Sequence, residues 1–127
     1  MKFFDALENR DPGQRERDLF AALPKQLAYA KANAPAFAEL YGAIDVAAVN
    51  SRAALARLPV IRKHELIERQ KALPPFGGLN ARPVGKLGRV FSSPGPIYEP
   101  EGTGEDWWRF ARSLHAAGFR AGDLVHN

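Results

Sequence analysis

The stretch Pro74-Pro75-Phe76-Gly77-Gly78 divides the sequence into two parts that differ in character. A proline lacks the backbone N–H that a helix needs, and paired glycines permit a sharp turn, so a helix cannot continue through it. Apolar residues recur with helical spacing before this stretch, whereas short runs of β-forming residues follow it. The sequence therefore predicts a helical region over residues 1–84 and a different region, with a few short strands, over residues 85–127.

A long helix is predicted to begin just after Asp11. Asp11 can cap it, Pro12 suits the first helical position, and Gln14 completes a capping pattern. The apolar stripe of this helix consists of Leu19, Leu23, Leu27, Ala30 and Ala34. Because Pro24 interrupts the stripe, we expect either a kink or a second helix that begins at Pro24.

Further short helices are predicted up to residue 71. Asp45 and Ser51 are candidate N-terminal caps for two of them. Residues 63–71 have the pattern of an amphipathic helix, on which Glu65 and Arg69 are spaced as an i,i+4 ion pair.

After the dividing stretch, residues 87–91 and 97–99 read as two short strands. The loop between them is Ser92-Ser93-Pro94-Gly95-Pro96. Serine hydroxyls can donate to phosphate oxygens and glycine lets a ligand approach the backbone, but each proline removes an N–H donor. From the residues alone, this loop is either a rigid turn or an anion-binding loop.

A last helix is predicted to start at Thr103 and to stop at Gly118, before a strand over residues 124–127. Its expected buried face consists of Trp107, Phe110, Ala111, Leu114 and Ala117. Trp108 lies one position off that face, and we expect it to meet another domain or a partner. An apolar strand needs neighbouring strands and a continuation, so we expect the chain to be a fragment of a longer protein.

The composition excludes several classes of protein. Hydrophobic residues make up 46% and charged residues 25% of the 127 residues, which is ordinary for a globular protein. Without cysteine there can be no disulfide and no thiolate metal site. No apolar run approaches the length of a membrane span or an export signal, so a cytoplasmic location without membrane contact is expected. The net charge of +4 comes from scattered basic residues, so nucleic acid is not an expected partner.

Titratable residues form no convincing catalytic or metal-binding pattern. The histidines lie far apart, at His64, His115 and His126. The acidic pairs are Glu99 with Glu101 and Glu105 with Asp106. The first pair suits the edge of a strand and the second the first turn of a helix. We therefore expect no metal site and no catalytic residue in this chain.

Five segments, taken in order, carry a resemblance to a known family. They are Leu58-Pro59-Val60-Ile61-Arg62-Lys63, Pro75-Phe76-Gly77-Gly78, Val90-Phe91-Ser92-Ser93, Trp108-Arg109 and Ala117-Gly118-Phe119-Arg120-Ala121-Gly122-Asp123-Leu124-Val125. Together they resemble the amino-terminal part of the adenylate-forming enzymes, specifically phenylacetate–CoA ligase and its relatives. The resemblance implies an α/β enzyme, of which residues 1–84 form a helical scaffold and residues 85–127 begin the ATP-binding α/β domain.

The resemblance also implies an activity for the intact protein. Such enzymes use ATP, CoA and Mg²⁺ to adenylate an aromatic carboxylic acid and transfer it to CoA, as in aromatic acid catabolism. Their phosphate loop usually reads Ser-Ser-Gly-Thr-Thr-Gly, so Ser92, Ser93 and Gly95 would contact ATP here. Pro94, Pro96 and Ile97 depart from that pattern and leave the loop stiffer and poorer in donors. The family's other essential segments have no counterpart in residues 1–127, so we expect this chain alone to be inactive and to bind no cofactor.

Two rival interpretations remain. The chain could be a small helical protein-interaction module without enzymatic activity, or, because it is basic, a nucleic-acid binder. The ligase interpretation predicts exposed apolar surface around Trp108 and Val125, and hence a homodimer or other self-association.

Overall fold

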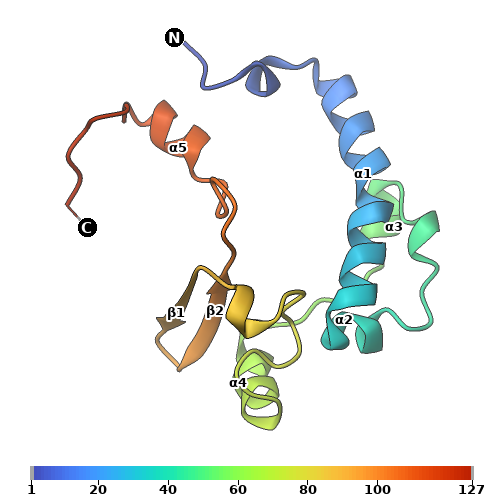
Figure 1. Cartoon of the computed structure of the whole chain (residues 1–127). Helices are drawn as coiled ribbons and strands as arrows, with labels where there is room; N and C mark the ends of the chain where they lie inside the picture. The colour runs from blue at the N-terminus through green and yellow to red at the C-terminus, as the bar shows by residue number, and fades with distance from the viewer. Residues whose placement is uncertain (1, 127) are drawn as a thin grey trace.

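The computed structural model describes residues 2–126 and is mostly helical, with one two-stranded sheet after residue 85 (Figure 1). The helical elements are η1 (Ala6–Asn9), α1 (Pro12–Asn33), α2 (Pro35–Leu40), η2 (Val46–Ala48), α3 (Arg52–Leu55), α4 (Lys63–Ala72), η3 (Val84–Lys86) and α5 (Ala111–Ala116). The strands are β1 (Arg89–Ser93) and β2 (Ile97–Glu101). The elements follow an open ring, with α1 on one side, α4 and the hairpin below, and α5 on the other side. The predicted fold class is confirmed.

Helix α1 begins as the sequence predicts. The Asp11 side chain accepts a hydrogen bond from the backbone N–H of Gln14 at 2.8 Å. Pro24 lies inside a single helix of 22 residues, so the alternative of a second helix beginning there is wrong. Pro24 has no N–H to donate within the helix. Leu23, just before it, and Leu27, after it, both pack in the same apolar cluster. That shared packing holds the two halves of the helix together.

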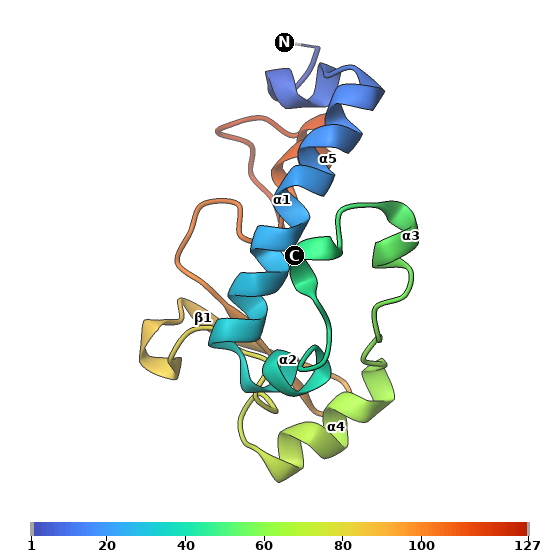
Figure 2. The ribbon, with the colours of Figure 1, turned by 90° about the vertical axis from the view of Figure 1, so that its right-hand side faces the viewer.

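The apolar core of the first half lies between α1 and the short helices that follow it. Its buried members are Leu27, Tyr41, Val49 and Ala54. Figure 2, which faces α1 from outside the ring, shows α2 at the end of α1 and α3 beside it. The predicted caps are confirmed, because the Asp45 side chain accepts from the Ala47 N–H and the Ser51 side chain accepts from the Ala54 N–H.

The predicted ion pair on α4 does not form. Glu65 reaches back instead and accepts a hydrogen bond from the backbone N–H of Arg62 at 2.9 Å, which caps the start of the helix. Arg69 pairs with Glu39 of α2 at 3.3 Å. The helix-capping bond therefore outcompetes the i,i+4 pair, and Arg69 links α4 to the first half of the chain.

A tight turn at Phe76-Gly77-Gly78 joins the two halves, as the sequence predicts. Phe76 is 2% exposed, and both glycines are buried with positive φ angles of 65° and 73°. A side chain at Gly77 would come within 2.7 Å of the Arg69 side chain. The carbonyl of Gly78 accepts a hydrogen bond from the Ala36 N–H at 3.0 Å, so this turn ties α4 to the start of α2.

Strands β1 and β2 form an antiparallel hairpin whose register pairs Ser93 with Ile97 and Arg89 with Glu101. The buried side chain of Gln70, on α4, holds the outer edge of β2. Its amide donates to the Tyr98 carbonyl at 2.8 Å, and its oxygen accepts from the Tyr98 N–H at 2.9 Å. Gln70 thus satisfies both backbone groups of Tyr98 as a neighbouring strand would.

The helix expected from Thr103 is much shorter than predicted. It begins only at Ala111, and the preceding residues form turns in which Asp106 and Arg109 have positive φ angles. Its expected buried face is wrong, because Trp107, Phe110 and Leu114 are all exposed. No described element packs against that face, and tertiary packing of an apolar face is what stabilises most protein helices. The Asp106 carboxylate instead accepts from the Ala111 N–H at 3.0 Å.

The end of α5 follows the prediction, whereas the strand after it does not form. Gly118 has a φ angle of 103°, and the N–H of Phe119 donates to the Leu114 carbonyl, which is a Schellman stop. Residues 124–126 are irregular, and Leu124 and Val125 are exposed. A strand needs a partner, and no described strand lies beside these residues. The fourth residue of the predicted strand, Asn127, lies outside the described residues.

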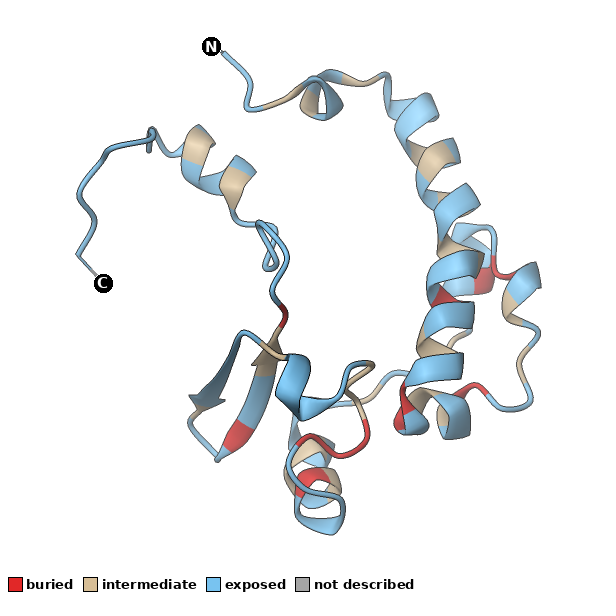
Figure 3. Cartoon of the chain, in the orientation of Figure 1, coloured by how far each residue is buried: buried red, intermediate tan, exposed pale blue. Residues whose placement is uncertain are grey.

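The chain exposes much more surface than a compact protein of its mass. Its accessible area is 9575 Å², whereas a compact monomer of 14.0 kDa exposes about 6,700 Å². Buried residues gather on α1 to α4 and around the turn after α4, and the α5 side of the ring is mostly exposed (Figure 3). The open ring therefore offers a large area for packing against other protein.

Replacing Gln70 tests whether its side chain holds the hairpin to α4. We expect Gln70→Leu to lower the free energy of unfolding by about 1–3 kcal/mol, because both backbone groups of Tyr98 lose their partner. Urea denaturation followed by circular dichroism measures the effect, with Gln26→Leu, at an exposed glutamine of α1, as control. Equal stability of Gln70→Leu and wild type would contradict this role.

Candidate functional site

The structure shortens the loop that the sequence placed between the two strands. Ser92 and Ser93 are the last two residues of β1, and only Pro94-Gly95-Pro96 form the turn. Gly95 has a φ angle of 134°, which only glycine adopts readily. The expectation of a five-residue loop is therefore wrong, because pairing of Ser93 with Ile97 and of Ser92 with Tyr98 extends the ladder into it.

The two serine side chains do not converge. Successive residues of a strand point to opposite faces, so the Ser92 and Ser93 hydroxyls lie on different sides of the hairpin. Ser93 pairs with the buried Ile97, and its hydroxyl is buried with no hydrogen-bond partner. Ser92 is exposed. In this conformation the two hydroxyls cannot contact the same phosphate. The turn has one backbone N–H donor, that of Gly95, because residues 94 and 96 are prolines.

Glu101, at the end of β2, has structural partners. Glu101 accepts a hydrogen bond from the Trp108 indole at 2.6 Å and lies 3.7 Å from the Arg89 guanidinium. The Phe91 and Trp108 rings make an edge contact on the same face, with centroids 6.0 Å apart. Glu101 therefore anchors the segment after the hairpin, as expected for a structural rather than an acid–base carboxylate.

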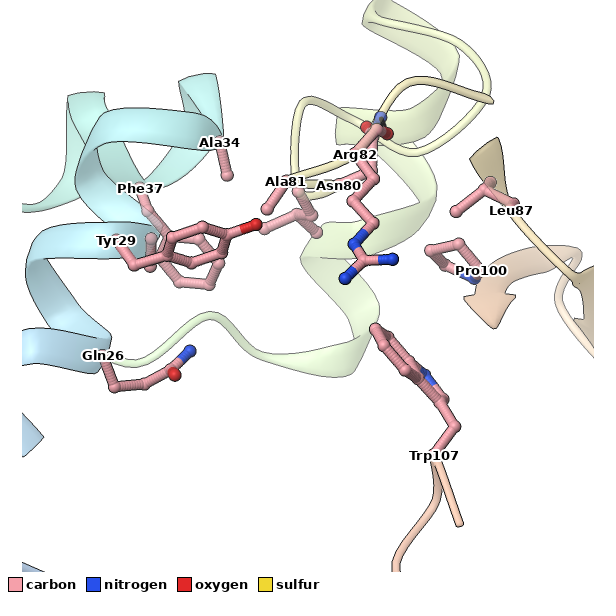
Figure 4. Close-up of a pocket in the computed structure, with 12 residues that line it drawn as sticks. Gln26, Tyr29, Ala34, Phe37, Asn80, Ala81, Arg82, Leu87, Pro100 and Trp107 are labelled. Carbon is pink, nitrogen blue, oxygen red and sulfur yellow. Dashed lines mark hydrogen bonds between the residues drawn. The ribbon is translucent and has the colours of Figure 1, made fainter. Parts of the chain in front are cut away.

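A pocket of about 440 Å³ lies between the end of α1 with α2 on one side and residues at and around the hairpin on the other (Figure 4). Its walls include Tyr29 of α1, Phe37 of α2, Arg82 and Trp107. The Arg82 guanidinium lies 5.9 Å from the Trp107 ring, a cation–π distance, and pairs with no carboxylate among residues 2–126. Aromatic walls and one free guanidinium can bind a planar anion.

Sequence reasoning missed this pocket. Its residues come from α1, α2, the segment after the Gly77-Gly78 turn, the hairpin and the segment after it. Local patterns carry no signal for such a long-range meeting. Ala30, Ala34 and Trp107 are expected from the sequence to be core residues, not pocket walls. The Trp107 ring covers Gly102 so closely that a side chain at Gly102 would overlap it.

Other titratable residues assemble no reactive site. Within residues 2–126, no three His, Asp or Glu side chains lie close enough together to hold a metal ion. His64 is exposed, and His115 makes an edge contact with Phe4 at a centroid distance of 5.8 Å. The helices that the structure describes are also too short or too polar to cross a membrane.

One ion pair joins the two ends of the ring. Arg112 of α5 donates to the Asp5 carboxylate at 2.8 Å, across 107 residues of sequence. This hydrogen bond lowers the pKa of Asp5 below its ordinary value of 3.8. Asp5 also caps η1 by accepting from the Glu8 N–H, so the same carboxylate serves both elements.

Comparison with known proteins found one informative likeness. No family model and no curated protein matches the chain. A solved structure of 2-hydroxyisobutyryl-CoA ligase, in the postadenylation state in complex with 2-HIB-AMP, superposes with a TM-score of 0.74 and 26% sequence identity. The likeness covers 96% of this chain and 26% of the ligase.

The chain is similar to a CoA ligase along nearly its whole length. It spans about a quarter of that enzyme. The expected resemblance is thus confirmed for a CoA ligase, and the mostly helical chain with its short hairpin fits a part of such an α/β enzyme. The finer resemblance to phenylacetate–CoA ligase stays a prediction.

Acid should open the contact between Asp5 and Arg112. Because the pKa of Asp5 is lowered in the folded chain, its contribution to stability is complete above about pH 4 and is lost as the pH falls through the lowered pKa. The chain has no cysteine, so dyes can be attached to Lys2→Cys and Ala117→Cys. We expect energy transfer between them to fall on acidification.

At neutral pH, Asp5→Asn should show the same fall, whereas Glu105→Gln should not. Glu105 is exposed and lacks a hydrogen-bond partner among the described residues, so this control removes the same charge. An unchanged dye distance in Asp5→Asn would show that the pair does not hold the ends together.

Proposed function

We propose that this chain forms the amino-terminal part of an ATP-dependent acyl- or aryl-CoA ligase. The carrying observation is its likeness, over 96% of its residues, to a CoA ligase solved with an acyl adenylate bound. The whole enzyme would act in the cytoplasm on an aromatic carboxylic acid, with ATP, CoA and Mg²⁺, in the manner of phenylacetate–CoA ligase.

The proposed reaction has two steps. A carboxylate oxygen attacks the α-phosphorus of ATP, so that an acyl adenylate forms and pyrophosphate leaves. The CoA thiol, losing its proton, then attacks the acyl carbon, so that a thioester forms and AMP leaves. The first step moves negative charge onto pyrophosphate, and fixed hydrogen-bond donors near that charge accelerate it.

The hairpin turn would supply such donors on the pyrophosphate side. Of the three residues that the family resemblance selects, Ser92 and Gly95 are exposed, whereas Ser93 is partly buried. The buried hydroxyl of Ser93 faces the opposite side. We therefore assign phosphate contact to the Ser92 hydroxyl and the Gly95 N–H, and to Ser93 a place in the ladder that positions them.

The division of labour follows the predicted boundary. Residues 1–84 would be a scaffold, since their own core lies between α1 and α3. Residues 85–127 would begin the ATP-binding domain, since the hairpin lies there and the exposed α5 side leaves surface for further strands and helices. A chain that spans about a quarter of the similar ligase would be inactive by itself.

The activity test compares the chain with the longer polypeptide that the proposal requires. Both are incubated with ATP, Mg²⁺, CoA and a panel of aromatic and short hydroxy acids, and CoA thioester is measured by mass spectrometry. We expect thioester from the longer polypeptide and none from residues 1–127. If the coding sequence specifies no continuation into an ATP-binding domain, the ligase proposal fails.

The assignment of Ser92 makes a sharper prediction in that longer polypeptide. Ser92→Ala should lower kcat/KM for ATP about tenfold or more, because it removes a hydrogen bond to a charged group. Ser93→Ala should change kcat/KM little, and Ser113→Ala, at an exposed serine of α5, is the matched control. Pyrophosphate exchange measures the adenylation step directly. A larger loss in Ser93→Ala than in Ser92→Ala would reverse the assignment.

An interaction module without enzymatic activity is the second candidate. The observation that favours it is the large exposed apolar surface on the α5 side, which includes Trp108 and Phe110. Such surface marks protein-binding sites in many soluble proteins. This candidate predicts no adenylation by any polypeptide that contains the chain.

A further inference from the structure

The outer edge of β1 has unpaired backbone groups. Gln70 binds both the N–H and the carbonyl of Tyr98, so these groups point away from β1. Ser92 lies opposite Tyr98, and in an antiparallel ladder the backbone groups of such a pair both face outward. Val90, two residues earlier, faces outward in the same way. No described residue donates to or accepts from the backbone of either one at this edge.

Nothing in the described residues protects this edge. Natural proteins shield edge strands with proline, lysine, a bulge or a covering element. Strand β1 has none of these, and its charged residue, Arg89, leans toward Glu101 of its own hairpin. Val90 and Phe91 are 49% and 42% exposed. The edge is thus a short, apolar template for another strand.

We propose that β1 pairs antiparallel with β1 of a second copy of this chain, about a twofold axis at Phe91. In this register Val90 of each copy faces Ser92 of the other. The two outward N–H groups and two outward carbonyls of each copy then form four hydrogen bonds across the interface. Phe91 lies opposite its own symmetry mate, next to Trp108, so the joint brings two aromatic pairs together.

Other registers satisfy fewer groups. With the twofold axis at Arg89 or Val90, a hydrogen bond between the copies would need the Gly88 N–H. That group already donates to the Glu101 carbonyl at 2.8 Å. An axis at Ser92 or Ser93 would need an N–H from Pro94, which has none. Registers shifted by one residue would need the N–H and carbonyl of Phe91 at the interface between the copies. These groups already face Glu99 within the hairpin. The strand therefore specifies one self-complementary register.

The assembly closes at two copies. The four strands would run β2, β1, β1 and β2, and each outer β2 edge is already bound by Gln70. An isologous joint with both outer edges occupied cannot extend into a fibre. The inference does not rest on the proposed ligase activity.

Size-exclusion chromatography with light scattering of the 127-residue chain tests the pairing. We expect a dimer whose dissociation constant rises about tenfold or more in Val90→Pro, because each copy loses one outward N–H. The inner ladder does not use this N–H, so the hairpin should remain. Phe91→Glu should also dissociate the dimer, since it places two carboxylates opposite each other. Val60→Glu, at another exposed apolar residue, is the control.

Amide hydrogen exchange identifies the edge itself. The Val90 and Ser92 amides should exchange more slowly as protein concentration rises, whereas Phe91 and Ser93 amides, inside the hairpin, should not change. A chain that is monomeric throughout the micromolar range overturns the inference. So does a dimer that both Val90→Pro and Phe91→Glu leave intact, because another surface must then hold it. If Val90→Pro unfolds the hairpin, Phe91→Glu and the exchange pattern decide.

Discussion

The two hydrogen bonds between Gln70 and the backbone of Tyr98 are the contact on which the second half of the chain depends. Close to them, the buried Phe76 and the two glycines after it bring α4 against the start of α2. Apart from this region, few contacts join the helices to the hairpin. A polar side chain buried beside a strand edge is tolerable because both of its amide groups are satisfied. The position of the hairpin, and of any anion held at its turn, therefore depends on Gln70 together with the packing of the buried Ile97.

The two halves differ in how they are stabilised. The helical half has a contiguous apolar cluster drawn from α1, α3 and the segments between them. The segment after the hairpin instead relies on single contacts, such as Trp107 over Gly102 and the Trp108 indole on Glu101. Its apolar side chains are exposed, which matches a fold unit whose packing partner lies elsewhere, either in the rest of a ligase or in a second copy.

Signals that act within four residues were read correctly from the sequence: the caps at Asp11, Asp45 and Ser51, the stop at Gly118 and the hairpin. Predictions that needed tertiary packing failed. The helix from Thr103 lacks a surface to bury its face, and Arg69 finds Glu39 because Glu65 is engaged in capping. At the candidate site, the sequence predicted a turn between two strands. It did not predict that the ladder includes Ser92 and Ser93, which places their hydroxyls on opposite faces. The pocket at Arg82 depends on contacts between distant segments, which no local pattern encodes.

The pair of Asp5 and Arg112 has a consequence for the order of folding. Closing a flexible loop of 107 residues costs at least about 4 kcal/mol in chain entropy, and an exposed ion pair contributes far less than that. The pair can therefore form only after the elements between its members have folded and brought the ends near each other. The presence of the pair therefore indicates that these elements are folded, whereas its loss alone does not indicate that they have unfolded.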